Sequence, residues 1–520
     1  MYRNPILLCD YSDPDVIRAG NLYFMVASSF NFTPGLPILA SKDLVHWKLV
    51  NYAVENIPVA RFAYPQNAQG IWAPSFSYHN GKYYIVVGMP DEGLYITEAD
   101  DILGHWSPLK QIYSSKGYID PYLFWDEDGS AWVIHAYAKS RCGFNSRLGL
   151  LKFDTEIFRC TGEDIQIFDG TETQPTIEGP KIYKRNGYYY IFAPAGGVSD
   201  GWQTVLRSKN LTGPFEEKIV LREGNSGING PHQGALVTTN EGEDWFIHFQ
   251  ERGIYGRITH LEPVKWVDDW PLIGTSVKNG IVPGEPVKIY RSPKVKKTKE
   301  SLYPQKNCLR AFEGASMEWQ WSGNHDDNFA KFTGTSDKDV ESFRLNVANV
   351  SSYAQNNFPV LWNSSNVLTR KISHENFYFK ANIDASNLPV GSRAGIIFLG
   401  EEYASLAVER TETGLDLVYI KSKNKKLTDI VREEHEEMRH PIPKDLVSSA
   451  LNFKMEFIPF SDYAAAVQFT VRCGGIIWPF KWKSDYFSTD NAHWVGGRFG
   501  VYAVGNGKGS VNFYNVKIRY

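Results

Sequence analysis

Asp120-Pro-Tyr-Leu-Phe-Trp-Asp-Glu-Asp-Gly129-Ser-Ala-Trp-Val-Ile134 is the most informative stretch of this 520-residue chain, because its pattern recurs along the first half of the sequence. A polar residue and a proline open the stretch, and apolar residues follow on both sides of Asp128-Gly129. Asp-Gly and Asn-Gly pairs accept the positive φ angles that tight hairpin turns require. The stretch therefore predicts a β-hairpin.

Four other stretches follow the same pattern, and the fifth copy is the least regular. The copies start at residues 13, 73, 120, 178 and 232, which are 60, 47, 58 and 54 residues apart. A four-stranded blade takes about 40–50 residues, and loops account for the rest. Long helical periodicity is absent from this half of the sequence. The repeats therefore predict a five-bladed β-propeller.

The repeat pattern ends before a polar, lysine-rich run, Ser292-Pro-Lys-Val-Lys-Lys-Thr-Lys-Glu-Ser301, which is typical of a solvated linker. Residues 302–520 contain many short alternating runs, among them Phe377-Tyr-Phe-Lys-Ala-Asn-Ile383, and these indicate a β-sandwich. The expected architecture is all-β. It comprises a propeller over residues 1–291, a linker over 292–301 and a concanavalin-like sandwich over 302–520.

Composition and charge narrow the possible partners. Lys and Arg number 55 and Asp and Glu number 58, so the net charge is −3, and a general nucleic-acid or membrane-surface binder is not expected. No run of 18 apolar residues is present to span a membrane. The first residues lack the apolar run of a signal peptide, so a cytoplasmic location is the default expectation, or secretion if a signal peptide has been removed. The five cysteines form no CxxC pair of the kind that binds zinc.

The repeat register also predicts a site. Equivalent positions on the innermost strands of a propeller converge near one end of its axis, and here they are Asp13, Ala73, Asp120, Glu178 and His232. Clustered carboxylates repel one another, which costs stability unless they serve chemistry or bind a cation. Two carboxyl groups at a sugar-sized cavity are the usual equipment for glycoside hydrolysis, in which one protonates the leaving oxygen and the other activates water or attacks the sugar.

These motifs resemble those of glycoside hydrolase family 43. The similarity is carried by short stretches in the family's order over residues 1–275, which include Ser12-Asp-Pro-Asp-Val-Ile-Arg-Ala-Gly20, Ile71-Trp-Ala-Pro74, Ile119-Asp-Pro121, Ile177-Glu-Gly-Pro180 and Gly256-Arg257. Trp319-Gln-Trp-Ser-Gly-Asn-His325 and Ala394-Gly-Ile-Ile-Phe398 resemble, more weakly, the sandwich of the β-xylosidase and α-L-arabinofuranosidase branch.

The resemblance implies roles for individual residues. Asp13 is similar to the general base of an inverting reaction, Glu178 to the general acid, and Asp120 to a third carboxylate that tunes the pKa of the acid. Trp72 resembles a wall of the sugar subsite and Phe32 an aromatic residue at the pocket rim. Arg257 resembles an arginine that contacts substrate and the third carboxylate. His232 resembles a central histidine that lies beside a water or a calcium ion, and no cofactor is required.

The expected function is that of an inverting exo-glycosidase. It would release terminal β-D-xylosyl or α-L-arabinofuranosyl residues from xylan or arabinoxylan oligosaccharides, and the sandwich is expected to support and close the pocket. Alternatives are an endo-arabinanase, a retaining fructosidase on the same type of propeller, and a non-catalytic sugar-binding propeller. Asp15 is a rival to Asp13 as the base. An oligosaccharide is the expected partner, and the sequence leaves homo-oligomerisation open.

Overall fold

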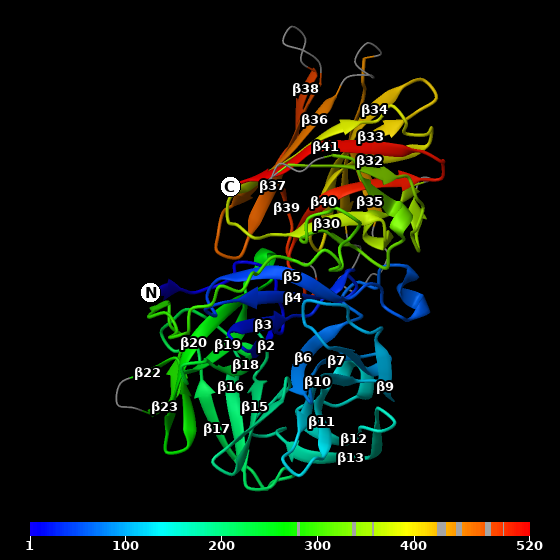
Figure 1. Ribbon diagram of the computed structural model, residues 1–520. Helices are drawn as coiled ribbons and strands as arrows, with labels where there is room; N and C mark the ends of the chain where they lie inside the picture. The colour runs from blue at the N-terminus through cyan, green and yellow to red at the C-terminus, as the bar shows by residue number, and fades with distance from the viewer. Residues whose placement is uncertain are drawn as a thin grey trace.

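The architecture of the computed structural model is a β-propeller followed by a β-sandwich, as the sequence predicts (Figure 1). The structure describes residues 1–277, 281–334, 340–355, 358–423, 433–443, 450–473, 480–491 and 493–520. The propeller runs from blue to green in Figure 1, and the sandwich runs from green through yellow to red. Among the described residues, no helix is long and apolar enough to cross a membrane.

The first three blades are four-stranded antiparallel sheets formed by consecutive strands. Their hairpins begin at the repeats predicted from the sequence. Blade 1 contains β2 (Asp15–Ala19), β3 (Leu22–Val26), β4 (Gly35–Ser41) and β5 (Trp47–Val54); blade 2 contains β6 (Trp72–His79), β7 (Lys82–Met89), β8 (Gly93–Ala99) and β9 (Lys110–Ser114); blade 3 contains β10 (Tyr118–Trp125), β11 (Ala131–Tyr137), β12 (Arg147–Asp154) and β13 (Arg159–Asp169).

The last two blades pair with segments from elsewhere in the chain: later strands extend blade 4, and the N-terminal segment pairs with blade 5. Blade 4 contains β14 (Lys181–Arg185), β15 (Tyr188–Ala195), β16 (Trp202–Ser208) and β17 (Glu216–Leu221), and β23 (Ile281–Glu285) and β22 (Thr275–Val277) extend its sheet. Blade 5 contains β18 (His232–Thr238), β19 (Asp244–Glu251), β20 (Arg257–Val267) and β21 (Trp270–Ile273). The N-terminal segment closes the ring, because β1 (Tyr2–Arg3) pairs with β24 (Ile289–Tyr290) and Leu7 forms a bridge with Thr259 on β20.

The sandwich consists of two antiparallel sheets packed face to face around one apolar core. One sheet has the order β25 (Gln320–Trp321), β30 (Val367–Lys371), β40 (Arg498–Gly505), β32 (Ser392–Leu399), β33 (Tyr403–Arg410), β34 (Leu415–Lys423) and β35 (Glu433–Pro441). The other has the order β26 (Ala330–Phe332), β27 (Glu341–Asn346), β41 (Ser510–Arg519), β31 (Phe377–Asp384), β36 (Leu451–Pro459), β37 (Ala465–Cys473) and β38 (Phe480–Lys483), and β39 (Phe487–Ser488) pairs with β37.

The remaining elements are short. They are α1 (Lys139–Cys142), the 3-10 helices η1 (Ala60–Ala63), η2 (Gly253–Tyr255), η3 (Asp327–Phe329) and η4 (Leu361–Asn363), and the two-stranded ribbon of β28 (Ala354–Gln355) and β29 (Phe358–Pro359). Cys9, Cys142, Cys160 and Cys308 are free thiols, and the side chain of Cys473 lies outside the described set. The predicted linker lies against the propeller, because Val295 packs on the cluster that joins blades 1 and 5.

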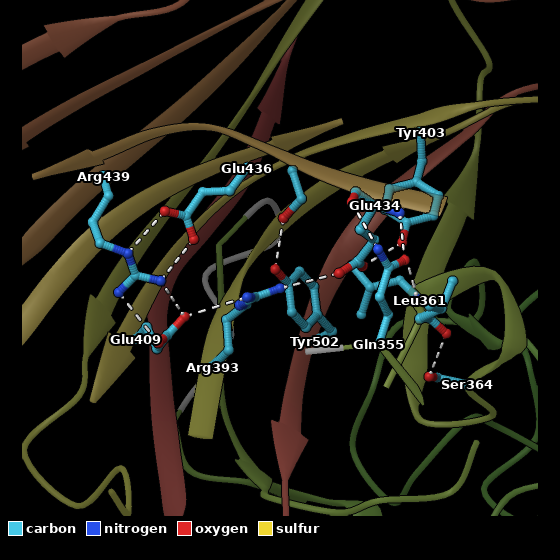
Figure 2. A network of polar contacts seen from close by, with 12 residues as sticks. Gln355, Leu361, Ser364, Arg393, Tyr403, Glu409, Glu434, Glu436, Arg439 and Tyr502 are labelled. Atoms are coloured by element: carbon cyan, nitrogen blue, oxygen red, sulfur yellow. Dashed lines mark hydrogen bonds and ion pairs between the residues drawn. The ribbon is translucent and has the colours of Figure 1, made fainter. Parts of the chain in front are cut away.

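A buried polar network lies on the outer face of the first sandwich sheet (Figure 2). The Arg393 guanidinium lies 3.3 Å from carboxylate oxygens of both Glu409 and Glu434, and the Tyr403 hydroxyl donates to Glu434. Glu434 also exchanges backbone hydrogen bonds with the side chain of Gln355. Buried charges need partners of opposite sign, and the network pairs the Arg393 guanidinium with both carboxylates. It thereby holds the segment of β28, β29 and η4 against the sheet.

This segment connects the sandwich to the propeller. The Trp362 carbonyl accepts a hydrogen bond of 3.0 Å from Asn67, and the Ser365 hydroxyl donates to the Ala63 carbonyl at 2.9 Å. Further along the interface, Thr33 and Trp321 form a β-bridge with backbone bonds of 3.1 and 2.7 Å. Because main-chain bonds cross the boundary, the two domains have a fixed mutual register near blades 1 and 2.

The core of blade 5 contains a histidine that should make the protein sensitive to acid. His260 is 1% exposed, neither ring nitrogen has a hydrogen-bond partner among the described residues, and its ring stacks on His248. Burial lowers the pKa of His260 well below its ordinary value, and the neighbouring His248 lowers it further. An unfolded histidine takes up a proton below about pH 6.5. The unfolded state therefore binds more protons than the folded state, and stability falls as the pH is lowered.

We expect His260→Leu to remove this part of the acid sensitivity. Below pH 6.5 the wild type should lose up to about 1.4 kcal/mol of unfolding free energy per pH unit relative to the variant. Urea unfolding at pH 7.5 and pH 5.5 measures the difference. His105→Leu, at an exposed histidine, is the control and should follow the wild type. Parallel losses in the wild type and His260→Leu would contradict the prediction.

Candidate active site

One end of the propeller contains a cavity of about 290 Å³ at the start of the inner strands. Asp13, Ala73, Asp120 and Glu178 all line it, so the structure brings together four of the five positions that the repeat register aligned. The fifth, His232, is fully buried behind Glu178. The convergence follows from the repeat itself, because each copy enters its blade at the same point.

The backbone turns these side chains toward the cavity. On β10, Ile119 pairs with Ala136 and Tyr122 with Ile134, so Asp120 and Pro121 together face a single residue of β11 in a β-bulge. Bulges re-aim side chains and are enriched beside active sites. Asp120 has φ 55° and Asp13 has φ 54°, values that non-glycine residues seldom adopt. Such strain persists where the surrounding structure holds it in place, which is common at functional sites.

Asp13 is held by hydroxyl groups and by an arginine. Its Oδ2 accepts hydrogen bonds from Ser12 at 2.9 Å and Ser28 at 2.5 Å, and its Oδ1 lies 3.2 Å from Arg257 Nη1. Its exposed fraction is 4%. The carboxylate is thus fixed in position and charge-balanced, while it still faces the cavity.

Asp120 is 6% exposed and is held by a backbone amide and by a glutamine side chain. Its Oδ2 accepts hydrogen bonds from the Gly179 backbone at 2.9 Å and from Gln233 Nε2 at 3.1 Å. Burial raises the pKa of Asp120 well above its ordinary value, and the charges of Glu178 and Asp13 raise it further. In the free protein Asp120 therefore holds a proton more readily than Glu178 does.

The pKa of Glu178 is shifted in the opposite direction from that of Asp120. Its Oε1 lies 2.7 Å from His232 Nε2, and 29% of its side chain is exposed toward the cavity. Partial burial raises the pKa of Glu178, but the hydrogen bond and charge of His232, with the charge of Arg257, outweigh this and lower the pKa below its ordinary value. His232 was expected as a substrate-binding residue. The structure places it outside the cavity, and its contact with the site is the 2.7 Å hydrogen bond between its Nε2 and Glu178 Oε1.

Arg257 lines the cavity and contacts the expected base. Its Nη1 donates to the Ser12 hydroxyl at 2.9 Å as well as to Asp13. The resemblance implied a contact with the third carboxylate, Asp120, and the structure instead pairs the guanidinium with Asp13. The reason is the start of β20 at Arg257, directly beside the segment that enters blade 1.

The aromatic wall of the cavity differs from the prediction in one residue. Trp72 lines the cavity as expected, and its indole nitrogen donates to the Ala68 carbonyl at 3.0 Å. Phe32 does not line it. Phe32 is 3% exposed and packs against the sandwich, where the Arg498 guanidinium lies 4.0 Å from its ring. Phe30, which has φ 52° and bridges Ile71, takes the place predicted for Phe32.

The sandwich contributes two residues to the cavity, His493 and Trp494. The Trp494 ring lies 5.2 Å from the Arg257 guanidinium, within the range of a cation–π contact. Lys139, Arg141 and Asn145, from the segment between β11 and β12, also line the cavity. The cavity is therefore bounded by both domains. The repeated motifs of the propeller do not predict these two residues, because His493 and Trp494 lie far away in the sequence and belong to no repeat.

Gln233 is a further site residue that the sequence-based prediction missed. It lines the cavity, donates to Asp120 and also hydrogen-bonds Glu178, which helps to lower the pKa of Glu178. Its φ of 35° places it in the same unusual backbone region as Asp13 and Asp120. The available signal was its place beside His232 in the fifth repeat.

Asp15, the alternative candidate for the general base, makes contacts that hold the blades together. Its Oδ2 accepts a 2.6 Å hydrogen bond from the Phe76 backbone and its Oδ1 lies 3.7 Å from Lys181 Nζ. These contacts join blade 1 to blades 2 and 4. Asp15 does not line the cavity, which favours Asp13 as the group that meets substrate.

The surroundings of His232 do not fit a calcium ion held by protein ligands. Calcium takes six to eight oxygen ligands, about 2.3–2.6 Å away. Within the described ranges no group of three or more His, Cys, Asp or Glu residues has an arrangement suited to a metal ion. The Nδ1 of His232 has no partner among those residues, and an imidazole nitrogen is a poor ligand for this hard cation.

A five-bladed propeller with three carboxyl groups at one end of its inner strands is the framework of a glycoside hydrolase. The sequence pattern of glycosyl hydrolases family 43 matches residues 2–271, and that of the beta xylosidase C-terminal concanavalin A-like domain matches residues 311–517. The chain belongs to glycosyl hydrolases family 43.

Individual relatives agree with this assignment. A putative beta-xylosidase of Xylanibacter ruminicola is 41% identical over 62% of this chain, and the chain spans 59% of that relative's length. A beta-xylosidase of Formosa agariphila is 30% identical over 79% of this chain and 75% of its own length. The fold is similar to the crystal structure of xylan beta-1,4-xylosidase from Bacillus halodurans C-125, with a TM-score of 0.79, 22% identity and 100% of both chains covered.

Proposed function

We propose that this protein is an inverting exo-glycosidase that releases terminal β-D-xylosyl or α-L-arabinofuranosyl residues from xylan or arabinoxylan oligosaccharides. The observation that carries the proposal is the meeting of Asp13, Asp120 and Glu178 in one small cavity. The names of the relatives favour xylose as the released sugar. The bounding of the cavity by both domains favours binding of a chain end, whereas an endo-arabinanase needs an open groove.

In this mechanism Asp13 is the general base. Its carboxylate accepts the proton of a water molecule as that water attacks the anomeric carbon. Ser12, Ser28 and Arg257 keep the carboxylate oriented toward the cavity, so little reorganisation is needed during the reaction. Because a positioned base is needed for every substrate, its role does not depend on the leaving group.

Glu178 is the general acid, which protonates the oxygen of the leaving sugar. In the free protein its pKa is lowered, so it must gain a proton when substrate binds. A sugar that covers the exposed part of Glu178 displaces water and raises the pKa of that carboxyl. Asp120, with its raised pKa, is the neighbouring proton reservoir and orients the pair through the Gly179 backbone and Gln233.

A proton NMR time course tests the proposal. Xylobiose and an arabinose-decorated xylo-oligosaccharide are incubated separately with the protein, and the spectrum identifies the sugar that leaves and its first-formed anomer. We expect α-xylose from the β-linked substrate. If β-xylose appears first, the inverting mechanism is rejected. If only arabinose is released, the xylosidase activity is rejected and the arabinofuranosidase activity is retained. Absence of any product would contradict hydrolysis of these glycans and favour a sugar-binding propeller.

A further inference from the structure

Asp10 connects three parts of the chain that are far apart in sequence. It precedes blade 1, is 6% exposed and does not line the cavity. Its Oδ1 accepts a hydrogen bond of 2.9 Å from the Arg257 backbone in blade 5, and its Oδ2 accepts one of 3.0 Å from the Gly496 backbone in the sandwich. A buried carboxylate with a backbone N–H on each oxygen is a strong and directional link.

On the propeller side this link fixes the start of β20. The Arg257 N–H is bound by Asp10, and the Arg257 carbonyl accepts a hydrogen bond of 3.1 Å from the Tyr11 backbone. The Arg257 backbone is thus held at both ends by residues 10 and 11. Its guanidinium contacts Ser12 and Asp13, the next residues of the same segment. The position of the arginine relative to the base therefore depends on Asp10.

Two glycines, Gly256 in the propeller and Gly496 in the sandwich, allow the two domains to approach each other closely. A Cβ on Gly496 would lie 2.8 Å from the Gly256 nitrogen, and a Cβ on Gly256, which has φ 75°, would lie 2.6 Å from the Asp10 carboxyl. The Gly497 N–H also donates to the Ile254 carbonyl at 2.8 Å. The segment of residues 493–497 is consequently pinned to the corner that precedes Arg257, and this places Trp494 over the guanidinium.

We propose that Asp10 is a positioning residue that ties the 493–497 segment of the sandwich to the backbone of Arg257. Through this link the sandwich sets both the position of the Arg257 guanidinium against Asp13 and the position of Trp494 at the cavity. The kinetic consequence rests on the function proposed above. Small displacements of a group that orients a base are costly, because a 1 Å misplacement can cost about 10²-fold in rate.

The test uses Asp10→Asn in the full chain. Asparagine has the same shape, but its amide nitrogen would face one of the two backbone N–H donors, so one hydrogen bond is lost and two donors oppose each other. We expect kcat/KM on xylobiose to fall at least about tenfold, mainly through kcat. The matched control is Glu375→Gln, which removes an exposed 3.2 Å ion pair between Arg252 and the sandwich and does not touch Arg257. It should stay within about twofold of the wild type.

A double variant separates positioning from general destabilisation. Arg257→Lys keeps the positive charge and removes the guanidinium contacts with Ser12 and Asp13. If Asp10 acts through Arg257, the double variant should have a kcat/KM less than about twofold below that of Arg257→Lys alone, because the effects of coupled residues are not additive. If the fold-loss of kcat/KM in the double variant instead equals the product of the fold-losses in the two single variants, the proposal is overturned.

Amide hydrogen exchange tests the link without any substrate. Asp10→Asn should accelerate exchange in the peptides that contain Arg257 and Gly496, and leave peptides of blades 2 and 3 unchanged, which shows that the propeller remains folded. Glu375→Gln should leave both peptides at the wild-type rate. Unchanged exchange in Asp10→Asn would overturn the proposed link. If the wild type hydrolyses none of the glycosides, the exchange result still decides the structural proposal, and only the function is rejected.

Discussion

Glu178→Gln is expected to lose about 10²–10⁴-fold in kcat/KM on xylobiose while it keeps most of its activity on an aryl xyloside with an acidic phenol leaving group. The amide preserves the shape of the side chain and its contact with His232, but it has no proton to give. A sugar leaving group needs that proton, whereas a good phenolate leaves without it. The ratio of the two kcat/KM values, measured for wild type and variant, reports the loss of acid catalysis alone.

Asp120→Asn is the matched comparison, because the pKa values of the two carboxyls point in opposite directions. Burial beside Glu178 and Asp13 raises the pKa of Asp120, and the His232 contact lowers that of Glu178. If Asp120 acts only by orienting Glu178 and supplying its proton, its variant should be slowed on xylobiose and should keep most of its activity on the aryl xyloside, with a smaller loss than Glu178→Gln. A larger loss on xylobiose in Asp120→Asn than in Glu178→Gln, with Glu178→Gln slowed on both substrates, would exchange the two roles.

The repeat in the sequence was sufficient to predict the fold and the meeting point of the carboxyls. The copies enter their blades at equivalent positions, so the topology places Asp13, Asp120 and Glu178 together although the loops between them differ in length. The pairing of turn residues with alternating apolar runs likewise predicts each hairpin. These patterns are local in sequence, and their repetition allows them to be recognised without the structure.

The missed features depend on single backbone angles and on distant segments. Phe30 and Phe32 alternate on one short stretch, and the positive φ of Phe30 together with the packing of Phe32 on Arg498 decides which ring reaches the cavity. Trp494 comes from the sandwich, where no periodic signal marks it. His232 still pairs with Phe249, and the register shift falls on the next residue, so Gln233 with its positive φ reaches the cavity while His232 contacts Glu178.

The ion-pair partner of Arg257 is another feature that could not be predicted from the sequence. The choice between Asp13 and Asp120 depends on where β20 begins relative to blade 1, and that junction is set by Asp10, Tyr11 and the glycines at 256 and 496. None of these contacts is local in sequence. The type of chemistry is therefore predictable from residue types in register, while the ion pairs that tune it require the three-dimensional packing.

Asp13→Asn is expected to lower kcat by about 10²–10⁴-fold on every glycoside, whatever its leaving group. Asparagine can still accept hydrogen bonds from Ser12 and Ser28, so the site should keep its shape. It cannot take a proton from water, and the attack of water is needed for xylobiose and for an aryl xyloside alike. A plot of the logarithm of the loss against the pKa of the leaving phenol should therefore be flat, in contrast to the slope expected for Glu178→Gln.

Asp15→Asn is the control for this prediction, since Asp15 is a carboxylate two residues further along the same segment. Its oxygens bind the Phe76 and Val16 backbones, so the variant should lose stability, and the folded fraction should retain the wild-type kcat. A rate of Asp13→Asn within tenfold of the wild type would reject Asp13 as the base. A flat, leaving-group-independent loss in Asp15→Asn instead would transfer that role to Asp15, because only the base is needed equally by all substrates.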